Sequence, residues 1–166
     1  MKTTSTKFSI NTPFGNFIAV YSDHGLAALN FPKGNTESSG GDAARQDVSP
    51  KIREWHHATE AALKKSLAGQ KSDKLPPLDL EGTEFQKSVW RELRKISPGK
   101  TKSYGEIAQA IGNPKAVRAV GGACGANPIP VLVPCHRVLA ANKKIGGFSG
   151  GMDWKYRLLE IEGVKV

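Results

Sequence analysis

The segment Asn127–Leu139, Asn-Pro-Ile-Pro-Val-Leu-Val-Pro-Cys-His-Arg-Val-Leu, constrains the fold of this chain more than any other. Prolines at positions 128, 130 and 134 fix φ along it and discourage a regular helix. The apolar run Val131–Val133 predicts that the chain enters the core here as a short buried strand or extended segment. The backbone that carries Cys135 is therefore expected to be stiff, buried and non-helical, as a positioned nucleophile requires.

Cys135 by itself has two interpretations. Most free cysteines behave as small buried hydrophobic residues, and one Cys-His pair does not distinguish a nucleophile from such a residue. In an extended chain, Cys135 and His136 would also point to opposite sides. Both interpretations stay open until the surrounding motifs are considered.

Length and cysteine content limit the class of protein. A chain of 166 residues forms one large domain or two small ones. No apolar run approaches membrane-spanning length, and Met1–Ser9 lacks the apolar region of a signal peptide. The two cysteines, Cys124 and Cys135, exclude a disulfide framework and a zinc site built from several cysteines. A reducing, cytoplasmic location is expected.

The net charge of +9 is unevenly distributed. Residues 1–80 hold 10 Lys and Arg against 8 Asp and Glu, a net charge of +2. Residues 81–166 hold 14 against 7, a net charge of +7. This asymmetry favours a polyanionic partner for the carboxy-terminal half. A generally basic surface without a partner is the alternative.

The amino-terminal half predicts an α/β domain. Strands are expected at Phe8–Ile10, Asn16–Tyr21 and Leu26–Phe31, with Gly25 in the second turn. A helix should begin at Ser49-Pro50 and end at Gly69, where apolar residues repeat at helical spacing. Residues 33–48 are expected to form a loop and residues 69–82 a linker. No catalytic grouping is present in this half.

The carboxy-terminal half predicts a helix-turn-helix. Capping boxes at Thr83–Gln86 and Ser103–Glu106 each mark the start of a helix. Gly112 should end the second helix, and Asn113-Pro114 should cap a third that runs towards Gly121-Gly122. That helix would expose Lys115 and Arg118, although an ordinary packed helical hairpin has the same pattern. The apolar side of a final helix, Met152–Glu162, is expected at Trp154, Leu158 and Leu159.

These motifs, in this order, resemble the O6-alkylguanine-DNA alkyltransferase family. The resemblance covers roughly residues 80–163 closely, and it rests on six ordered motifs: Gly82–Gln86, Ser103–Glu106, Asn113–Gly122, Asn127–Pro130, Pro134–Arg137, and the glycine-rich loop with the closing Leu-Leu-Glu-Ile-Glu-Gly. It implies an α/β fold with a small ribonuclease H-like amino-terminal domain, residues 1–78. Residues 79–166 would form a winged helix-turn-helix-like domain that carries the active cysteine.

The resemblance also implies the chemistry. Such a protein flips O6-alkylguanine, and by extension O4-alkylthymine, out of double-stranded DNA and takes the alkyl group onto a cysteine once, without cofactor or metal. A monomer is expected. General chemistry is consistent with this activity, because displacement at an alkyl carbon needs a thiolate. A base inside the duplex must also be extruded before it can react.

The family's site residues transfer to matching positions. Cys135 would be the acceptor, and His136 would activate it through a water. Glu162 would hold the imidazole, and Asn127 would brace the segment. Tyr104 would rotate the target phosphate, and Arg118 would fill the gap in the base stack. The other residues expected at the DNA or the flipped base are Val138, Phe148, Ser149, Lys115, Ala119, Gly121 and Arg137. Phe148 stands where certain relatives have tyrosine, and Cys124 where a larger apolar residue can line the pocket, so the range of alkyl groups stays open.

Two other functions stay open beside this one. A Cys-His-Glu hydrolase would need an oxyanion hole and would release product over many turnovers. A non-catalytic protein that binds lesions without repairing them would lack the acceptor cysteine, which is present here as Cys135.

Overall fold

The computed structural model describes residues 5–33, 48–72, 74–140 and 150–165. Backbone contacts divide the chain into two compact units, one of residues 1–64 and 72–80, the other of residues 65–71 and 81–166. Strands and helices occur in both parts of the chain, which confirms the mixed α/β class. The proposed domain boundary between residues 78 and 79 stays a prediction.

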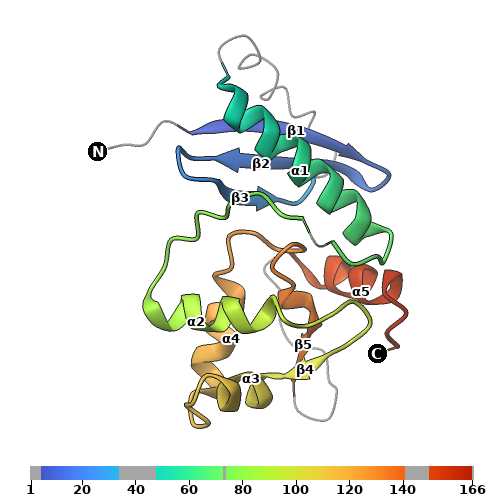
Figure 1. Ribbon diagram of the computed structural model, residues 1–166. Helices are drawn as coiled ribbons and strands as arrows, with labels where there is room; N and C mark the ends of the chain where they lie inside the picture. The colour runs from blue at the N-terminus through green and yellow to red at the C-terminus, as the bar shows by residue number, and fades with distance from the viewer. Residues whose placement is uncertain (1–4, 34–47, 73, 141–149, 166) are drawn as a thin grey trace. The chain divides into compact units, whose positions relative to one another are not determined.

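The first unit contains an antiparallel sheet of order β1-β2-β3 (Figure 1), formed by β1 (Thr6–Thr12), β2 (Gly15–Tyr21) and β3 (Leu26–Asn30). Alternate side chains of β1 and β2 are buried, as expected for strands with one face in a core. Helix α1 (Pro50–Leu67) crosses that face, and its His56 ring stacks on Phe8 with the centroids 4.5 Å apart. The hairpin and the helix predicted from the sequence are both present.

Gly25 makes the second turn of this sheet possible. Its φ is +155°, and a Cβ at this position would lie 2.3 Å from the carbonyl oxygen of Pro77. The close approach lets the Leu26 N–H donate to Pro77 O at 2.8 Å, while the Asp79 N–H donates to Leu26 O at 2.8 Å. The segment around Pro77 therefore runs alongside the start of β3.

The second unit is mainly helical, with α2 (Glu84–Leu93), α3 (Tyr104–Ala110), α4 (Val117–Gly125) and α5 (Met152–Ile161). Both predicted capping boxes are present, at the starts of α2 and α3. Val89, Trp90 and Leu93 form the buried side of α2, and the Trp90 indole N–H donates to Ala123 O of α4 at 2.8 Å. Helices α3 and α4 follow each other through a short turn and form the expected helix-turn-helix (Figure 1).

Two local predictions for the second unit were wrong. Helix α4 begins at Val117 with Ala116 as its N-cap, because residues 113–116 close a turn in which the Ala116 N–H donates to Asn113 O at 3.0 Å. The helix runs through the glycines at 121 and 122, as expected, and continues to Gly125. Residues 131–133 are buried as expected, but they form turns and not a strand.

A two-stranded parallel sheet joins distant parts of the second unit. Strand β4 (Lys102–Ser103) pairs with β5 (Val138–Leu139), with Lys102 opposite Val138 and Ser103 opposite Leu139. Tyr104 directly follows β4, while the residues before β5 carry Cys135. The pairing therefore fixes the start of α3 beside the cysteine segment.

Across the described ranges, no helix has the length and hydropathy needed to span a membrane.

Candidate active site

Asn127 organises the turn that leads to Cys135. Its side-chain oxygen accepts from the Ile129 N–H at 2.9 Å, and its side-chain nitrogen donates to Val133 O at 2.8 Å. The Val133 N–H donates to Ile129 O at 2.9 Å, so one amide side chain closes a compact loop. The Cys135 N–H then donates to Val133 O at 2.8 Å, which connects this loop directly to the cysteine.

Val131 lies within this loop in a conformation that is rare for its residue type. Its φ is +73°, and among the described residues no other non-glycine residue has a positive φ. A β-branched side chain in the left-handed region costs on the order of 1–3 kcal/mol. The side chain is buried, and the Asn127 hydrogen bonds on either side of Val131 hold the backbone in place.

Cys135 begins a short 3₁₀ helix, η2 (Cys135–Arg137), and is 2% exposed. Burial raises the pKa of its thiol to about 11, while the Asn127 side chain, as hydrogen-bond partner, and the Lys155 charge act in the opposite direction. In this environment the resting cysteine is a thiol at neutral pH. Formation of the thiolate therefore requires a nearby base or cation.

His136 contacts Glu162, the C-cap residue of α5. Its Nε2 lies 2.9 Å from Glu162 Oε2, and both side chains are almost fully buried. Burial lowers the pKa of the imidazole, while Glu162 opposes this effect. Burial by itself would raise the pKa of Glu162, but hydrogen bonds from His136 and Arg137 outweigh it and lower the value to about 2.

Because Glu162 is an ionised acceptor, the imidazole proton belongs on Nε2. Nδ1 then carries a lone pair. It is buried and has no hydrogen-bond partner among the described residues. A neutral imidazole with a free, buried acceptor is suited to take a proton from an adjacent group.

Arg137 lies elsewhere than expected. Its side chain is 8% exposed, and its guanidinium donates from Nε and Nη2 to Glu162 and from Nη1 to Ile96 O at 2.6 Å. The expected contact of Arg137 with DNA therefore does not fit its position, because all three nitrogens point into the protein. The bidentate geometry of guanidinium and carboxylate explains why this arginine turns inward.

Lys155 is a site residue that the sequence analysis missed. It is fully buried on α5, donates to Val138 O at 2.9 Å, and lies 5.9 Å from the centroid of the Tyr104 ring. Its charge lowers the pKa of Cys135, and burial lowers its own pKa. A lysine is rarely fully buried without a partner. The spacing of residues along a helix does not predict a buried lysine when its partners are distant in sequence.

Trp154, expected on the apolar side of α5, is only half-buried.

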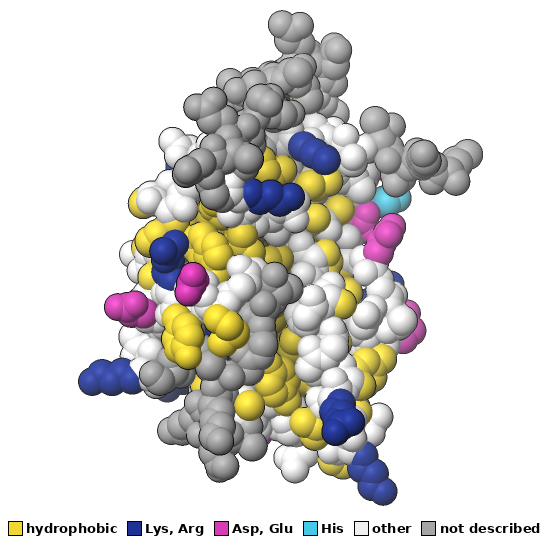
Figure 2. Space-filling view, turned by 180° about the vertical axis from the view of Figure 1, so that it is seen from behind, with side chains coloured by type: hydrophobic (Ala, Val, Ile, Leu, Met, Phe, Trp, Pro, Cys, Tyr) yellow, Lys and Arg dark blue, Asp and Glu magenta, His cyan; other side chains and the backbone are white. Residues whose placement is uncertain are grey.

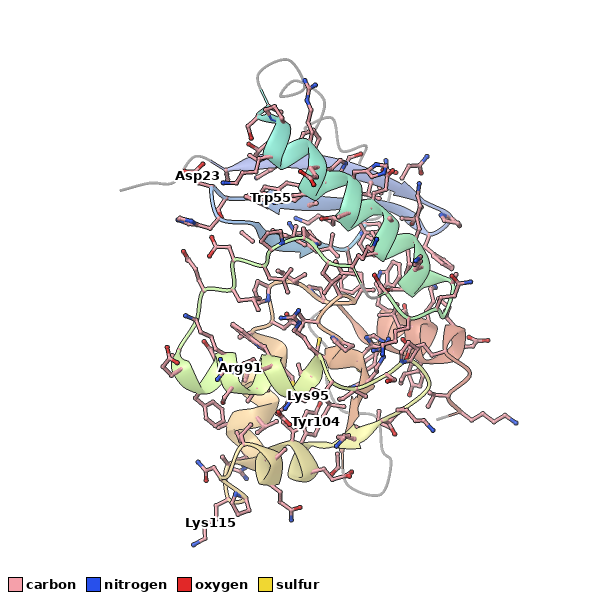
Figure 3. All side chains as sticks on the ribbon, in the orientation of Figure 1. Asp23, Trp55, Arg91, Lys95, Tyr104 and Lys115 are labelled. Atoms are coloured by element: carbon pink, nitrogen blue, oxygen red, sulfur yellow. The ribbon has the colours of Figure 1, made fainter. Side chains whose placement is uncertain are left out.

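Tyr104 completes the group around the thiol. It is half-buried at the first turn of α3 (Figure 3). Burial raises the pKa of its phenol to about 12, and the nearby thiols of Cys124 and Cys135 act in the same direction. Burial likewise raises the pKa of Cys124 to about 12. Cysteine, tyrosine and lysine from three different elements thus converge at one place.

Comparisons with known proteins agree with this geometry. Residues 84–164 match the family model "6-O-methylguanine DNA methyltransferase, DNA binding domain". A methylated-DNA–protein-cysteine methyltransferase of Methanosarcina acetivorans is 42% identical over 92% of this chain and 94% of its own length. The chain belongs to this family of methyltransferases.

Other family members support the assignment. A methyltransferase of Mycolicibacterium paratuberculosis is 54% identical over 58% of each chain. The crystal structure of Mycobacterium tuberculosis OGT in complex with DNA has a TM-score of 0.77 and 36% identity, and covers 95% of this chain and 92% of its own. A crystal structure described as the O6-methylguanine methyltransferase of the same organism has a TM-score of 0.74.

In this methyltransferase, the start of α4 presents exposed side chains. Lys115, Arg118 and Ala119 are exposed, whereas Val120, Ala123 and Cys124 on the other side of the helix are buried. Lys115 projects away from the helices in the turn before α4 (Figure 3). Val117, beside Arg118, is 42% exposed, an unusual position for a large apolar side chain.

The glycines of α4 have free space around them. A Cβ at Gly121, Gly122 or Gly125 would meet no described atom within 4 Å. Packing inside the protein therefore does not require these residues to be small.

On the face seen in Figure 2, Lys and Arg side chains are spread over the surface with apolar side chains between them.

The remaining expectations concern Val138, Phe148 and Ser149. Val138 is buried, and its carbonyl accepts from Lys155, which leaves one lone pair for a further donor. Phe148 and Ser149 lie outside the described residues. Among the described residues, no group of three or more His, Cys, Asp or Glu side chains could hold a metal ion.

Proposed function

We propose that this protein repairs double-stranded DNA by transferring the alkyl group from O6 of guanine, and from O4 of thymine, to Sγ of Cys135 in a single turnover. The observation that carries the proposal is the buried His136–Glu162 pair directly after the buried Cys135 in a chain of this family, with a lone pair on His136 Nδ1. Arg137 is assigned to the protein interior and not to DNA.

The reaction exchanges one bond for another. The thiolate attacks the alkyl carbon, so the S–C bond forms as the C–O6 bond breaks and the electron pair leaves with the guanine oxygen. The thiol proton passes to His136 Nδ1, directly or through one water. A thioether results, and neither water nor the protein converts it back to a thiol, so no second turnover follows.

Three side chains prepare the thiol for this step. Asn127 fixes the backbone before Cys135 and is a hydrogen-bond partner of the thiol. Lys155 places a buried positive charge close to the developing thiolate, where electrostatic stabilisation is strong. Tyr104, beside the same thiol, would contact the extruded base and its phosphate.

DNA binding is assigned to the helix-turn-helix. Extruding a base from the duplex costs a few kcal/mol, and the exposed Arg118 side chain would fill the resulting gap with Val117 beside it. The small residues Ala119, Gly121 and Gly122 allow the helix backbone to approach the DNA closely. Lys115 would contact phosphate, as expected for an exposed lysine at the end of this element. A monomer in the compartment that holds the DNA, whether cytoplasm, nucleoid or nucleus, completes the proposal.

Intact-mass spectrometry tests this function. The protein is incubated with a duplex oligonucleotide that contains O6-methylguanine, and the gain in mass is mapped to a peptide. We expect each molecule to gain one methyl group in place of one hydrogen, on Cys135, and the Cys135→Ser variant to gain none. Continued repair with the lesion in excess over protein would show a multiple-turnover enzyme, such as a hydrolase, and would refute the proposal.

A further inference from the structure

Arg137, Glu162 and His136 form a buried group in which one carboxylate serves two partners. The side chains are 8%, 2% and 1% exposed, respectively. Glu162 Oε2 lies 2.9 Å from His136 Nε2 and 2.7 Å from Arg137 Nη2, and Arg137 Nε lies 3.0 Å from Glu162 Oε1. The guanidinium thus occupies both carboxylate oxygens, while the imidazole shares one of them.

The charge balance of this group determines which form the imidazole takes. Glu162 carries one negative charge, and the arginine side chain keeps its positive charge in proteins. With a neutral His136, the three side chains of Arg137, Glu162 and His136 together have no net charge. A protonated His136 would leave an uncompensated positive charge in the interior. Because burying unpaired charge is costly, the neutral imidazole is favoured.

We propose that Arg137 is a positioning residue that supplies the counter-charge of Glu162 and thereby keeps His136 a neutral base for Cys135. Without that charge, Glu162 would have His136 as its nearest cationic partner, and the imidazole would bind a proton to restore balance. The inference rests on the proposed function, in which His136 accepts the proton of Cys135.

The other groups around His136 do not replace Arg137. From α5, Lys155 is the second cation near the imidazole, but its ammonium donates to Val138 O and faces the thiols of Cys124 and Cys135. The Gly99 N–H approaches Glu162 Oε1 at 3.4 Å and carries no charge. On η2 itself, the neighbouring titratable group is the Cys135 thiol. All of these stay in place when only Arg137 is changed.

The titration of His136, measured by NMR on histidine-labelled protein, is the direct test. Its signal is assigned by its absence in His136→Gln. In the wild type, we expect the imidazole to titrate below its ordinary pKa of 6.5. In Arg137→Gln, whose amide can still donate to Glu162 but has no charge, the pKa should rise by about one to three units.

Two matched variants separate charge from structure. Arg137→Lys keeps the charge and should titrate close to the wild type. Arg137→Gln combined with Glu162→Gln removes both charges, so the pKa of His136 should return to its low value. Circular dichroism spectra confirm that each variant is folded. The wild-type titration is informative even when a variant does not fold, because an imidazole that titrates at or above 6.5 would overturn the inference.

The pH dependence of methyl transfer provides a second readout. The reactive form holds one proton between Cys135 and His136, so the rate falls on the acid side when the imidazole becomes protonated. In Arg137→Gln this acid limb should move to higher pH by the same interval as the NMR titration, whereas a purely structural role would lower the rate equally at every pH. If the wild type transfers no methyl group, the proposed function fails while the NMR titration still decides the role of Arg137. If it does transfer and Arg137→Gln titrates as the wild type, this inference alone fails.

Discussion

Removing the side chain of Asn127 should weaken the fold and the reaction together. Asn127→Ala removes the hydrogen bonds to Ile129 N and Val133 O and leaves the buried Ile129 N–H without its partner. The lost hydrogen bond to Val133 O, about 0.5–1.5 kcal/mol, and the unpaired Ile129 N–H, about 1–3 kcal/mol, together predict a loss of about 2–4 kcal/mol in the free energy of unfolding. Because Val133 O also accepts from the Cys135 N–H, the thiol should shift as well. A displacement of about 1 Å at a reacting atom costs about a hundredfold in rate.

Urea unfolding measures the stability loss, and single-turnover methyl transfer measures the rate. Asn11→Ala is the matched control, since Asn11 is exposed on β1 and its replacement should change stability by less than about 0.5 kcal/mol. Asn127→Asp retains the acceptor for Ile129 N but buries a carboxylate oxygen against Val133 O, so at neutral pH it should destabilise the protein at least as much as Asn127→Ala. An Asn127→Ala protein that loses the expected stability yet transfers at the wild-type rate would refute a role for Asn127 in positioning Cys135.

The other predictions concern DNA binding and acid stability. Arg118→Ala should slow transfer from duplex DNA but hardly change the slow reaction with free O6-methylguanine base, which needs no extrusion; an equal loss in both rates would exclude its role in filling the stack. Gly121→Ala should stabilise the protein by about 0.5–1 kcal/mol in thermal unfolding yet weaken binding in a DNA titration, and unchanged affinity would show that the backbone does not approach DNA there. The stabilisation from Glu162 should be complete above its ordinary pKa of 4.5 and disappear as the pH falls through about 2, because folding lowers this pKa. Glu162→Gln should remove this part of the pH dependence of urea unfolding.

Local signals in the sequence predicted most of the fold. The two capping boxes need only residues three positions apart, so Thr83 and Ser103 could be assigned as N-caps from sequence alone. The hairpin turn at Gly25 follows from the same kind of short-range chemistry. The start of α4 was misplaced because Asn113-Pro114 is equally consistent with an N-cap and with the turn that the structure shows.

The features that the sequence did not reveal depend on distant partners. Arg137 turns inward because Glu162 and the carbonyl of Ile96 meet it there, and neither lies near it in the sequence. Lys155 is buried because its ammonium donates a hydrogen bond to Val138 O, whose position is fixed by the pairing of β4 with β5. The left-handed conformation of Val131 depends on the hydrogen bonds of the Asn127 side chain to Ile129 N and Val133 O. The periodicity of helices and strands does not predict such bonds.

The burial of Cys135 predicts that the methylated protein is less stable than the unmodified one. A thiol with 2% exposure has close neighbours on almost every side, so a methyl group added to its sulfur must be accommodated by displacing them. Overpacking of this kind costs typically about 1–3 kcal/mol, a large part of the margin by which most proteins stay folded. Chaperones and proteases respond to differences of that size by changing abundance. If Cys135 is the acceptor, the methylated molecule is therefore expected to unfold more readily than the unused one and to be degraded faster.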